Sequence, residues 1–332
     1  MVHAIWKRHD DLDAALLAVK KIMMSELSTI HPDVKQKIID YINAPGKYLR
    51  AGLCLYLAKE VEGHISKGKL YLAASIEVLH LATLIHDDVI DEADLRRTLE
   101  PFHKTHTNKI AIYAGDYLLA YAGRLSNKGY RLLEPANTKS MDMMQYQLIE
   151  RILVGELTQL MNQNNLSMTM KSYLKQIKGK TAFLFGMACQ LGAWNPRLSK
   201  KELQAARRIG IYLGMAFQLS DDLIDFRSPK KQSGKPRMQD IQNGIYTAPT
   251  IIAMQESSEV RTLLGTKQNK QWEQWELDAF YDHLVSLNSF HRTETLLEKY
   301  IDKIQHNVHL LPVKNPEPFL AFIKNILIGK TS

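Results

Sequence analysis

The chain of 332 residues carries one acidic pattern twice, Asp-Asp-x-x-Asp, beginning at Asp87 and again at Asp221. On a helix, residues four apart share a face, so each motif would project its first and last carboxylates from one side. Like charges held this close need a compensating cation. Hard divalent ions such as Mg²⁺ suit carboxylates that share coordination with phosphate oxygens. We therefore expect two carboxylate clusters that bind a phosphorylated ligand through metal ions.

Each motif taken alone has a plainer interpretation, because acidic residues often decorate helix ends as solvated surface. Both motifs, however, follow long apolar runs and stand at the C-terminal ends of predicted helices, where the helix dipole disfavours carboxylates. Two such placements in one chain favour the metal-binding interpretation. The predicted metal ligands are Asp87, Asp91 and Asp221, and Asp88 and Asp222 are predicted as further catalytic carboxylates.

The elements that position these motifs are predicted to be helices almost throughout. Apolar residues recur at three- and four-residue spacing in 13–27, 34–42, 50–61, 69–90, 110–126, 145–163, 170–193, 200–224, 248–254, 273–288, 292–307 and 316–329. Strand-like alternation is rare, and no Gly/Ser/Pro-rich linker divides the chain. The pattern predicts an all-α, single-domain bundle over residues 1–332, with about ten or more helices around a central cleft.

The composition narrows the function classes. The net charge is +8, but the basic residues are scattered, which disfavours nucleic acid as a partner and favours small phosphorylated substrates. Cys54 and Cys189 have no metal-binding spacing and suit a reducing, cytoplasmic compartment. The N-terminal segment lacks signal-peptide features. The most apolar windows, 70–85 and 183–194, are shorter than the roughly 20 residues of a membrane span, so stable membrane insertion is not expected.

Further short motifs accompany the aspartates in order, from Gly46 to about Pro249. They are Gly46-Lys47-Tyr48-Leu49-Arg50, His80, Arg96-Arg97, Gly115-Asp116-Tyr117, Gly155-Glu156 with Gln159, Lys180-Thr181, Phe217-Gln218 and Gly234-Lys235. This ordered set resembles the trans-isoprenyl diphosphate synthase (polyprenyl synthetase) family. The resemblance implies the isoprenoid synthase fold, three Mg²⁺ ions per site, and condensation of isopentenyl diphosphate with an allylic diphosphate.

The resemblance places four residues at isopentenyl diphosphate: Lys47, Arg50, His80 and Arg97. Arginine suits this role because its planar fork binds phosphate oxygens bidentately. Without the family, Lys47 and Arg50 are compatible with exposed charges after a Pro-Gly turn, and His80 with a hydrogen-bonded core residue. The alternative for the Arg96-Arg97 pair is local salt bridging with the nearby Glu92 and Asp94.

The allylic side is implied to contain Arg96, Lys180, Thr181, Gln218 and Lys235. Lys180 and Lys235 are the expected catalytic cations that neutralise the departing diphosphate. The chain departs from the family pattern at Pro45, Ala51, Thr98 and Ile245. None of these departures removes an expected metal ligand, but Ile245 replaces a common lysine and weakens the case for diphosphate contacts in its loop.

Other functions fit the motifs less well. A class I terpene cyclase also uses Asp-Asp-x-x-Asp on an all-α fold, but usually pairs it with an Asn/Asp–Ser/Thr–Glu triad and needs no second diphosphate site. Intact aspartates in both motifs argue against a noncatalytic subunit. The expected assembly is a homodimer, with a heterodimer containing a small regulatory subunit as the alternative.

Product length depends on how far an apolar tail can extend past the first motif. In the family, aromatic residues four and five positions before the first aspartate stop growth early, and here these positions hold Thr83 and Ala82. The small side chains predict a product of C30 or longer, as in hexaprenyl- and heptaprenyl-type synthases, with farnesyl or geranylgeranyl diphosphate as the alternative. A deeper stop is expected at Ile76 or Tyr121. Helix geometry places Thr83, rather than Ala82, on the face of Asp87.

Replacing Ala82 by Phe is expected to shorten the product, because an aromatic ring would close the path of the tail. Chain-length analysis of the reaction products tests this expectation. An unchanged product length would contradict the open path.

Overall fold

The computed structural model describes residues 3–6, 9–27, 30–96, 98–133, 139–227, 238–268 and 270–328, without the side chains of Asp10 and of residues 139–148. Arg97 and Lys235, two of the predicted site residues, lie outside this description. Over the described ranges the regular structure is helical, and the remaining backbone pairing is an isolated bridge between Arg96 and Leu99. The prediction of an all-α protein is confirmed.

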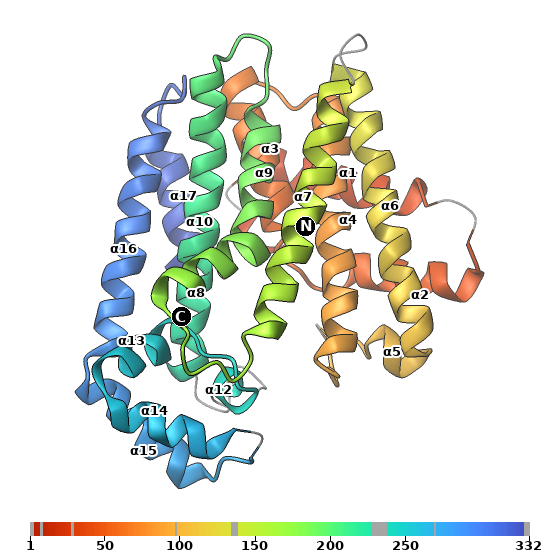
Figure 1. The fold of residues 1–332 in the computed structure, drawn as a ribbon. Helices are drawn as coiled ribbons and strands as arrows, with labels where there is room; N and C mark the ends of the chain where they lie inside the picture. Colours follow the sequence, from red (N-terminus) through yellow and green to blue (C-terminus); the bar gives the residue numbers. More distant parts are fainter. Residues whose placement is uncertain are drawn as a thin grey trace. The chain divides into compact units, whose positions relative to one another are not determined.

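The helices, which are labelled in Figure 1, form two compact units. The first contains Met1–Gln147, Met187–Arg207 and Pro312–Lys314, and the second contains Leu148–Gly186, Arg208–Leu311 and Asn315–Ser332. Each unit holds one of the two aspartate motifs. One domain over residues 1–332 and a central cleft both remain predictions.

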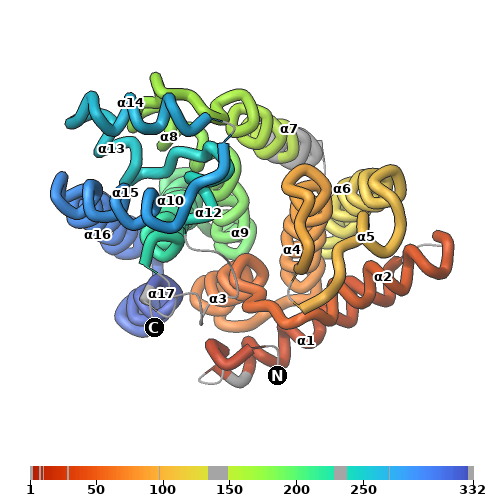
Figure 2. Tube along the Cα trace, turned by 90° about the horizontal axis from the view of Figure 1, so that it is seen from below, coloured from red at the N-terminus to blue at the C-terminus, as the bar shows by residue number. Residues whose placement is uncertain are grey.

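The core of the first unit is α4 (Lys67–Ile90), which packs against α1 (Asp10–Ser25), α3 (Leu49–Glu62) and α6 (Asn108–Leu133) (Figure 2). Residues 71–79 of α4 are all buried. By length and composition α4 could cross a membrane, but 78% of its apolar window is buried inside the protein. This burial is what an apolar helix at the centre of a bundle requires. The unit also contains η1 (Ala4–Trp6), α2 (Pro32–Asn43) and α5 (Phe102–Thr105).

The second unit has a short buried helix, α13 (Ala248–Glu256), at its core. Residues 248–254 are buried, and α13 contacts α8 (Met170–Ile177), α14 (Ser258–Lys267), α15 (Gln274–Ser286) and α16 (Ser289–Val308). The unit also contains the π-helical turn η2 (Lys178–Ala182), α12 (Gln239–Gln242) and α17 (Glu317–Ile328). Three helices belong partly to each unit: α7 (Lys139–Met161), α9 (Phe183–Ala193) and α10 (Lys200–Arg227).

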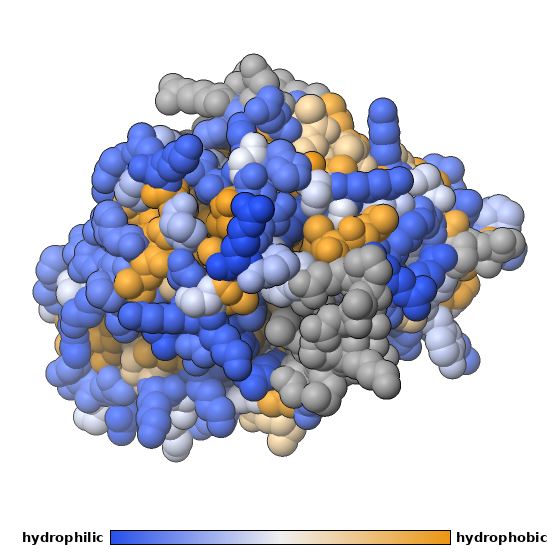
Figure 3. Space-filling model, turned by 90° about the horizontal axis from the view of Figure 1, so that it is seen from above, coloured by the Kyte–Doolittle hydropathy of each residue, from blue (hydrophilic) through white to orange (hydrophobic). Residues whose placement is uncertain are grey.

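Exposed apolar side chains are interspersed with hydrophilic ones on the face seen in Figure 3. Scattered apolar side chains are ordinary on a protein surface, whereas a group on one helix is informative. Helix α7 of the second unit exposes Leu153, Val154, Leu157, Leu160 and Met161. In the first unit α6 exposes Ile110, Ile112, Tyr113 and Leu132.

Candidate active site

The first aspartate motif occupies the C-terminal turn of α4. Asp91 is the C-cap residue, and its backbone N–H donates to the Asp87 carbonyl at 2.8 Å. Asp87 is half-buried, Asp91 is exposed and Asp88 is fully buried. Because each helical residue is turned by about 100° from the last, the second aspartate faces the core while the first and third remain accessible. The accessible pair matches the predicted metal ligands of this motif.

Asp88 is held by its own set of donors. Arg96 donates from Nε to Asp88 Oδ1 at 2.6 Å and also forms an ion pair with that oxygen, and Tyr41 donates its hydroxyl to Oδ2 at 3.2 Å. The Tyr41 hydroxyl in turn accepts the Phe102 backbone N–H at 3.0 Å. Burial, with the Asp88 charge, raises the pKa of Tyr41, so it remains a donor. Asp88 therefore fixes Arg96 and the segment that follows the motif.

The predicted site of isopentenyl diphosphate lies at the N-terminal end of α3. Lys47 and Arg50 are half-buried there, and Tyr48 between them has a left-handed backbone conformation with φ +50°. Trp6 donates from Nε1 to the Lys47 carbonyl at 2.7 Å. The Ala51 N–H donates to Glu77 Oε1 on α4 at 3.0 Å, one turn before the half-buried His80. The structure thus brings the basic loop beside the part of α4 that carries His80.

The second aspartate motif stands near the C-terminal end of α10. Asp222 is buried, whereas Asp221 and Asp225 are half-buried. The Asp225 carboxylate accepts the backbone N–H groups of Gln239 at 3.1 Å and Asp240 at 3.4 Å. The third aspartate of this motif therefore anchors the start of α12, and Asp221 is the half-buried carboxylate that is predicted to bind a metal ion.

Asp222 ends a chain of hydrogen bonds within the second unit. Thr181 donates from Oγ1 to Gln218 Oε1 at 2.9 Å, and Gln218 donates from Nε2 to Asp222 Oδ1 at 3.2 Å. The Tyr173 hydroxyl and the Ala248 N–H donate to the other Asp222 oxygen. Burial raises the pKa of Asp222 to about 7, although the three hydrogen bonds favour the charged form. Predicted residues Thr181 and Gln218 are thereby brought together.

Lys180 lies on the π-helical turn, where the Phe183 N–H donates to the Lys178 carbonyl. Its ammonium forms an ion pair of 2.7 Å with Glu156 on α7. A Cβ on Gly155 would stand 2.5 Å from the Lys180 backbone nitrogen, so only glycine allows α7 to approach this turn. Single π turns occur often at functional sites. The Gly155-Glu156 and Lys180-Thr181 motifs are thus two halves of one local structure.

Residues 32–283 match the family model described as polyprenyl synthetase. This chain belongs to the polyprenyl synthetase family. The heptaprenyl diphosphate synthase component 2 of Bacillus subtilis is 30% identical over 322 residues, covering 97% of this chain and 88% of that protein.

Two solved structures show the same fold. A decaprenyl diphosphate synthase from Rhodobacter capsulatus has a TM-score of 0.86 at 27% identity, covering 96% of this chain and 97% of its own. A geranylgeranyl pyrophosphate synthase from Lactobacillus brevis has a TM-score of 0.85 at 26% identity, covering 98% of this chain and 99% of its own. The predictions of an isoprenoid synthase fold and of a prenyltransferase family are confirmed.

Polyprenyl synthetases use a divalent metal, and the side chains present fit one. Asp87, Asp91 and Asp221 supply the hard oxygen donors that Mg²⁺ prefers. Among the described residues, no group of three or more His, Cys, Asp or Glu side chains forms a ready-made metal site. The roles of individual residues, and the meeting of the two motifs, remain predictions.

Several residues that shape this polyprenyl synthetase site were missed in the sequence. Tyr41 and Tyr173 each hold the middle aspartate of a motif, and Glu77 fixes the basic loop. No local pattern marks either tyrosine, since each lies more than forty residues from its aspartate. Glu156 belongs to the Gly155-Glu156 motif, but its pairing with Lys180 is visible only in the structure.

Replacing Asp88 by Asn is expected to lower the free energy of unfolding by about 2–4 kcal/mol, because the Arg96 charge loses its buried partner. The matched change Asp91→Asn removes an exposed carboxylate and is expected to shift stability by at most about 0.5 kcal/mol. Urea denaturation of both variants measures the difference. Equal losses would contradict the structural role of Asp88.

Proposed function

We propose that this polyprenyl synthetase condenses isopentenyl diphosphate with an allylic diphosphate to make an all-trans polyprenyl diphosphate of C30 or longer. The observation that carries the proposal is the repeated arrangement of the motifs. In each, the middle aspartate is buried and hydrogen-bonded to a tyrosine, and the first remains accessible. That arrangement suits two metal-binding carboxylate clusters, each beside basic side chains that can take a diphosphate.

The first unit would bind isopentenyl diphosphate and part of the metal. Asp87 and Asp91 are the proposed metal ligands, and Lys47, Arg50, His80 and Arg97 are the proposed partners of the isopentenyl diphosphate group. Half-burial of Lys47, Arg50 and His80 supports this role, since partly desolvated cations bind phosphate oxygens more strongly than exposed ones do. Arg96, on the allylic side, is already fixed by Asp88 at the exit of the motif.

The second unit would stabilise the leaving diphosphate. Asp221 is its proposed metal ligand, Lys180 and Lys235 its catalytic cations, and Thr181 and Gln218 its groups near the reacting carbons. When bound, Mg²⁺ neutralises the diphosphate oxygens that gain charge. We propose three such ions per site.

The proposed reaction requires no protein nucleophile. The allylic C–O bond breaks, and its electron pair leaves with diphosphate. The double bond of isopentenyl diphosphate then forms a C–C bond to the allylic carbon. Loss of a proton to the released diphosphate restores a double bond in the product. Preorganised positive charge at the leaving group is the protein's main contribution to rate.

The proposed path of the growing tail follows one face of α4. Asp87, Thr83, His80 and Ile76 lie within a narrow sector of that helix. Thr83 and His80 are half-buried, whereas Ile76 is 2% exposed, about 16 Å along the axis from Asp87. Tyr121 donates its hydroxyl to the Met23 carbonyl of α1 at 2.9 Å and is thereby held toward α1. These contacts favour Ile76 over Tyr121 as the deeper stop.

A geranylgeranyl-type product is the second candidate. The burial of Ile76 favours it, because a fixed side chain at this depth would end elongation early. The small side chains of Thr83 and Ala82 favour the longer product.

We propose that the enzyme acts as a dimer in the cytoplasm. The exposed apolar side chains of α6 and α7 support an interface on these helices. The word component in the name of the Bacillus subtilis relative supports a heterodimer with a small subunit as the alternative to a homodimer. Two buried free cysteines, Cys54 and Cys189, are compatible with a reducing compartment.

The purified chain should be incubated with farnesyl diphosphate, labelled isopentenyl diphosphate and Mg²⁺. Labelled polyprenyl diphosphate from the chain alone supports the function and a homo-oligomer. Turnover that requires an added small subunit supports the heterodimer. A cyclic hydrocarbon released from the allylic substrate without isopentenyl diphosphate would contradict the proposal.

Replacing Ile76 by Ala is expected to lengthen the product by at least one C5 unit, because the shorter side chain opens the face of α4 below His80. Chain-length analysis measures this change. Tyr121→Phe is the control, since it removes the hydrogen bond to α1 but keeps the ring, and its product should match the wild type. An unchanged product length in Ile76→Ala would contradict the assignment of Ile76 as the deeper stop.

A further inference from the structure

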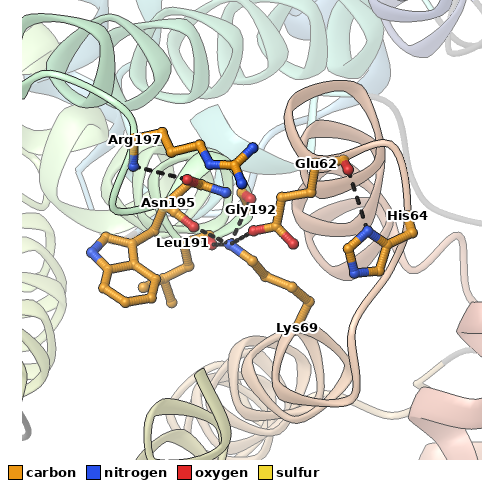
Figure 4. A network of polar contacts seen from close by, with 8 residues as sticks. Glu62, His64, Lys69, Leu191, Gly192, Asn195 and Arg197 are labelled. Atoms are coloured by element: carbon orange, nitrogen blue, oxygen red, sulfur yellow. Dashed lines mark hydrogen bonds and ion pairs between the residues drawn. The ribbon is translucent and has the colours of Figure 1, made fainter. Parts of the chain in front are cut away.

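The N-terminal end of α4 contains a buried lysine that the proposed reaction does not use. Lys69 is 0% exposed, and its ammonium donates to the carbonyls of Leu191 and Gly192 at 2.9 Å and of Trp194 at 2.5 Å (Figure 4). It also forms an ion pair of 3.2 Å with Glu62, which is 10% exposed. An ammonium has three donors, so every one is used. Lysine is almost never fully buried unless it is paired in this way.

These contacts join the ends of three helices of the first unit. The acceptor carbonyls belong to the C-terminal end of α9 and the residue after it, where a helix leaves carbonyl groups without intrahelical partners. Glu62 is the last residue of α3, an end at which the helix dipole disfavours a carboxylate. The positive charge of Lys69 therefore stabilises both the C-terminal carbonyls of α9 and the carboxylate at the C-terminal end of α3. Burial lowers its pKa, and the neighbouring Glu62 opposes that shift.

Helices α3 and α4 are therefore fastened at two places. Glu77 of α4 accepts the Ala51 N–H in the first turn of α3, and Lys69 of α4 holds Glu62 at its last residue. A helix fastened at both ends to the same neighbour neither slides nor rotates along it without breaking a buried polar contact, which is costly. The first turn of α3 carries Arg50, and the far end of α4 carries Asp87.

We propose that Lys69 is a positioning residue that sets the placement of Lys47 and Arg50 relative to Asp87. The contacts of Lys69 would affect the site without touching it, because Lys69 lies eighteen residues, or about 27 Å, before Asp87 on α4. They act on the isopentenyl diphosphate side, since α3 carries the basic loop. This inference rests on the proposed function for its kinetic readout, but the fastening itself is measurable without turnover.

The test compares Lys69→Met with Lys59→Met. Lys59 lies on α3 and pairs with Asp11 on the surface, where both side chains are well exposed. Lys69→Met is expected to raise KM for isopentenyl diphosphate about tenfold, the scale expected from a small misplacement of binding groups, and to leave KM for the allylic substrate within about twofold. Lys59→Met is expected to change neither value.

Stability is separated from positioning by the double variant Lys69→Met with Glu62→Leu. Replacing a buried ion pair by apolar side chains often restores stability. The double variant is expected to recover part of the melting temperature lost in Lys69→Met, because Glu62 is no longer left unpaired while the three carbonyls still lack a donor, and its KM for isopentenyl diphosphate is expected to stay raised. An unchanged KM for isopentenyl diphosphate in folded Lys69→Met, or an equal rise for both substrates, would overturn the proposal. If neither Lys69→Met nor the double variant folds, Glu62→Gln is measured instead. A KM for isopentenyl diphosphate and a hydrogen-exchange rate that both match the wild type would overturn the proposal.

Hydrogen exchange measures directly whether the contacts of Lys69 hold α3 against α4. Lys69→Met is expected to speed exchange of the backbone amides of residues 46–52, and Lys59→Met is expected to leave them unchanged. If the wild-type chain has no prenyltransferase activity, the proposed function fails, and this exchange measurement still decides the fastening. Unchanged exchange in residues 46–52 would overturn it.

Discussion

The constraint on which the site depends is the repulsion among three carboxylates placed on a little more than one helical turn. In both motifs the middle carboxylate is removed from water and satisfied inside the protein. Asp88 takes hydrogen bonds from Arg96 and Tyr41, and Asp222 takes them from Tyr173, Gln218 and a backbone N–H. A buried carboxylate without such donors would shift strongly toward its neutral form. Each motif thus separates into one internal carboxylate and an accessible remainder.

The two internal carboxylates are supported differently, and this has electrostatic consequences. Asp88 has a cationic partner, whereas the partners of Asp222 are neutral. Burial raises the pKa of Asp222, and the hydrogen bonds from these neutral groups offset that rise only in part. The second motif therefore differs from the first in the groups that support its middle carboxylate. It is also the motif whose third carboxylate is occupied with anchoring α12.

Helix α4 combines three demands on one element. Its C-terminal turn presents the first motif, its middle carries His80, and its N-terminal turn supplies the buried ammonium that joins α3 to α9. It is 24 residues long and lies at the core of its unit, and this burial explains its near-continuous apolar sequence. The same composition makes it resemble a membrane span, and its burial resolves the ambiguity.

Helical periodicity predicted α4 and α10 to within a few residues, because long amphipathic or buried segments carry a strong signal. The four-residue helices α5 and α12 are too short for any periodicity, and α14 was missed as well. Residues 170–193 were predicted as one helix. In the structure a π turn separates α8 from α9 within this range. The sequence did not reveal the turn, because a single added residue leaves the apolar pattern on each side intact.

Within the site, spacing along the helix predicted which side chains share a face, but not what supports them. The burial of Asp88 and Asp222 depends on tyrosines distant in sequence. The fastening by Lys69 depends on carbonyls more than 120 residues away. Contacts of this kind join residues that are distant in the sequence, so no local sequence pattern predicts them. Resemblance to a family named the residues, and the structure supplied their partners.

The ion pair between Lys180 and Glu156 has a thermodynamic consequence for ligand binding. A diphosphate that binds Lys180, as proposed, meets an ammonium that is already engaged by a carboxylate 2.7 Å away. Binding therefore exchanges the Glu156 carboxylate for the diphosphate as the partner of Lys180. The net binding free energy of this contact is the difference between the attraction of Lys180 to the diphosphate and its attraction to Glu156. Because salt screens both attractions, this contact should be less sensitive to ionic strength than a solitary lysine would be. Singly charged anions, which gain less from the lysine, compete poorly with the internal carboxylate.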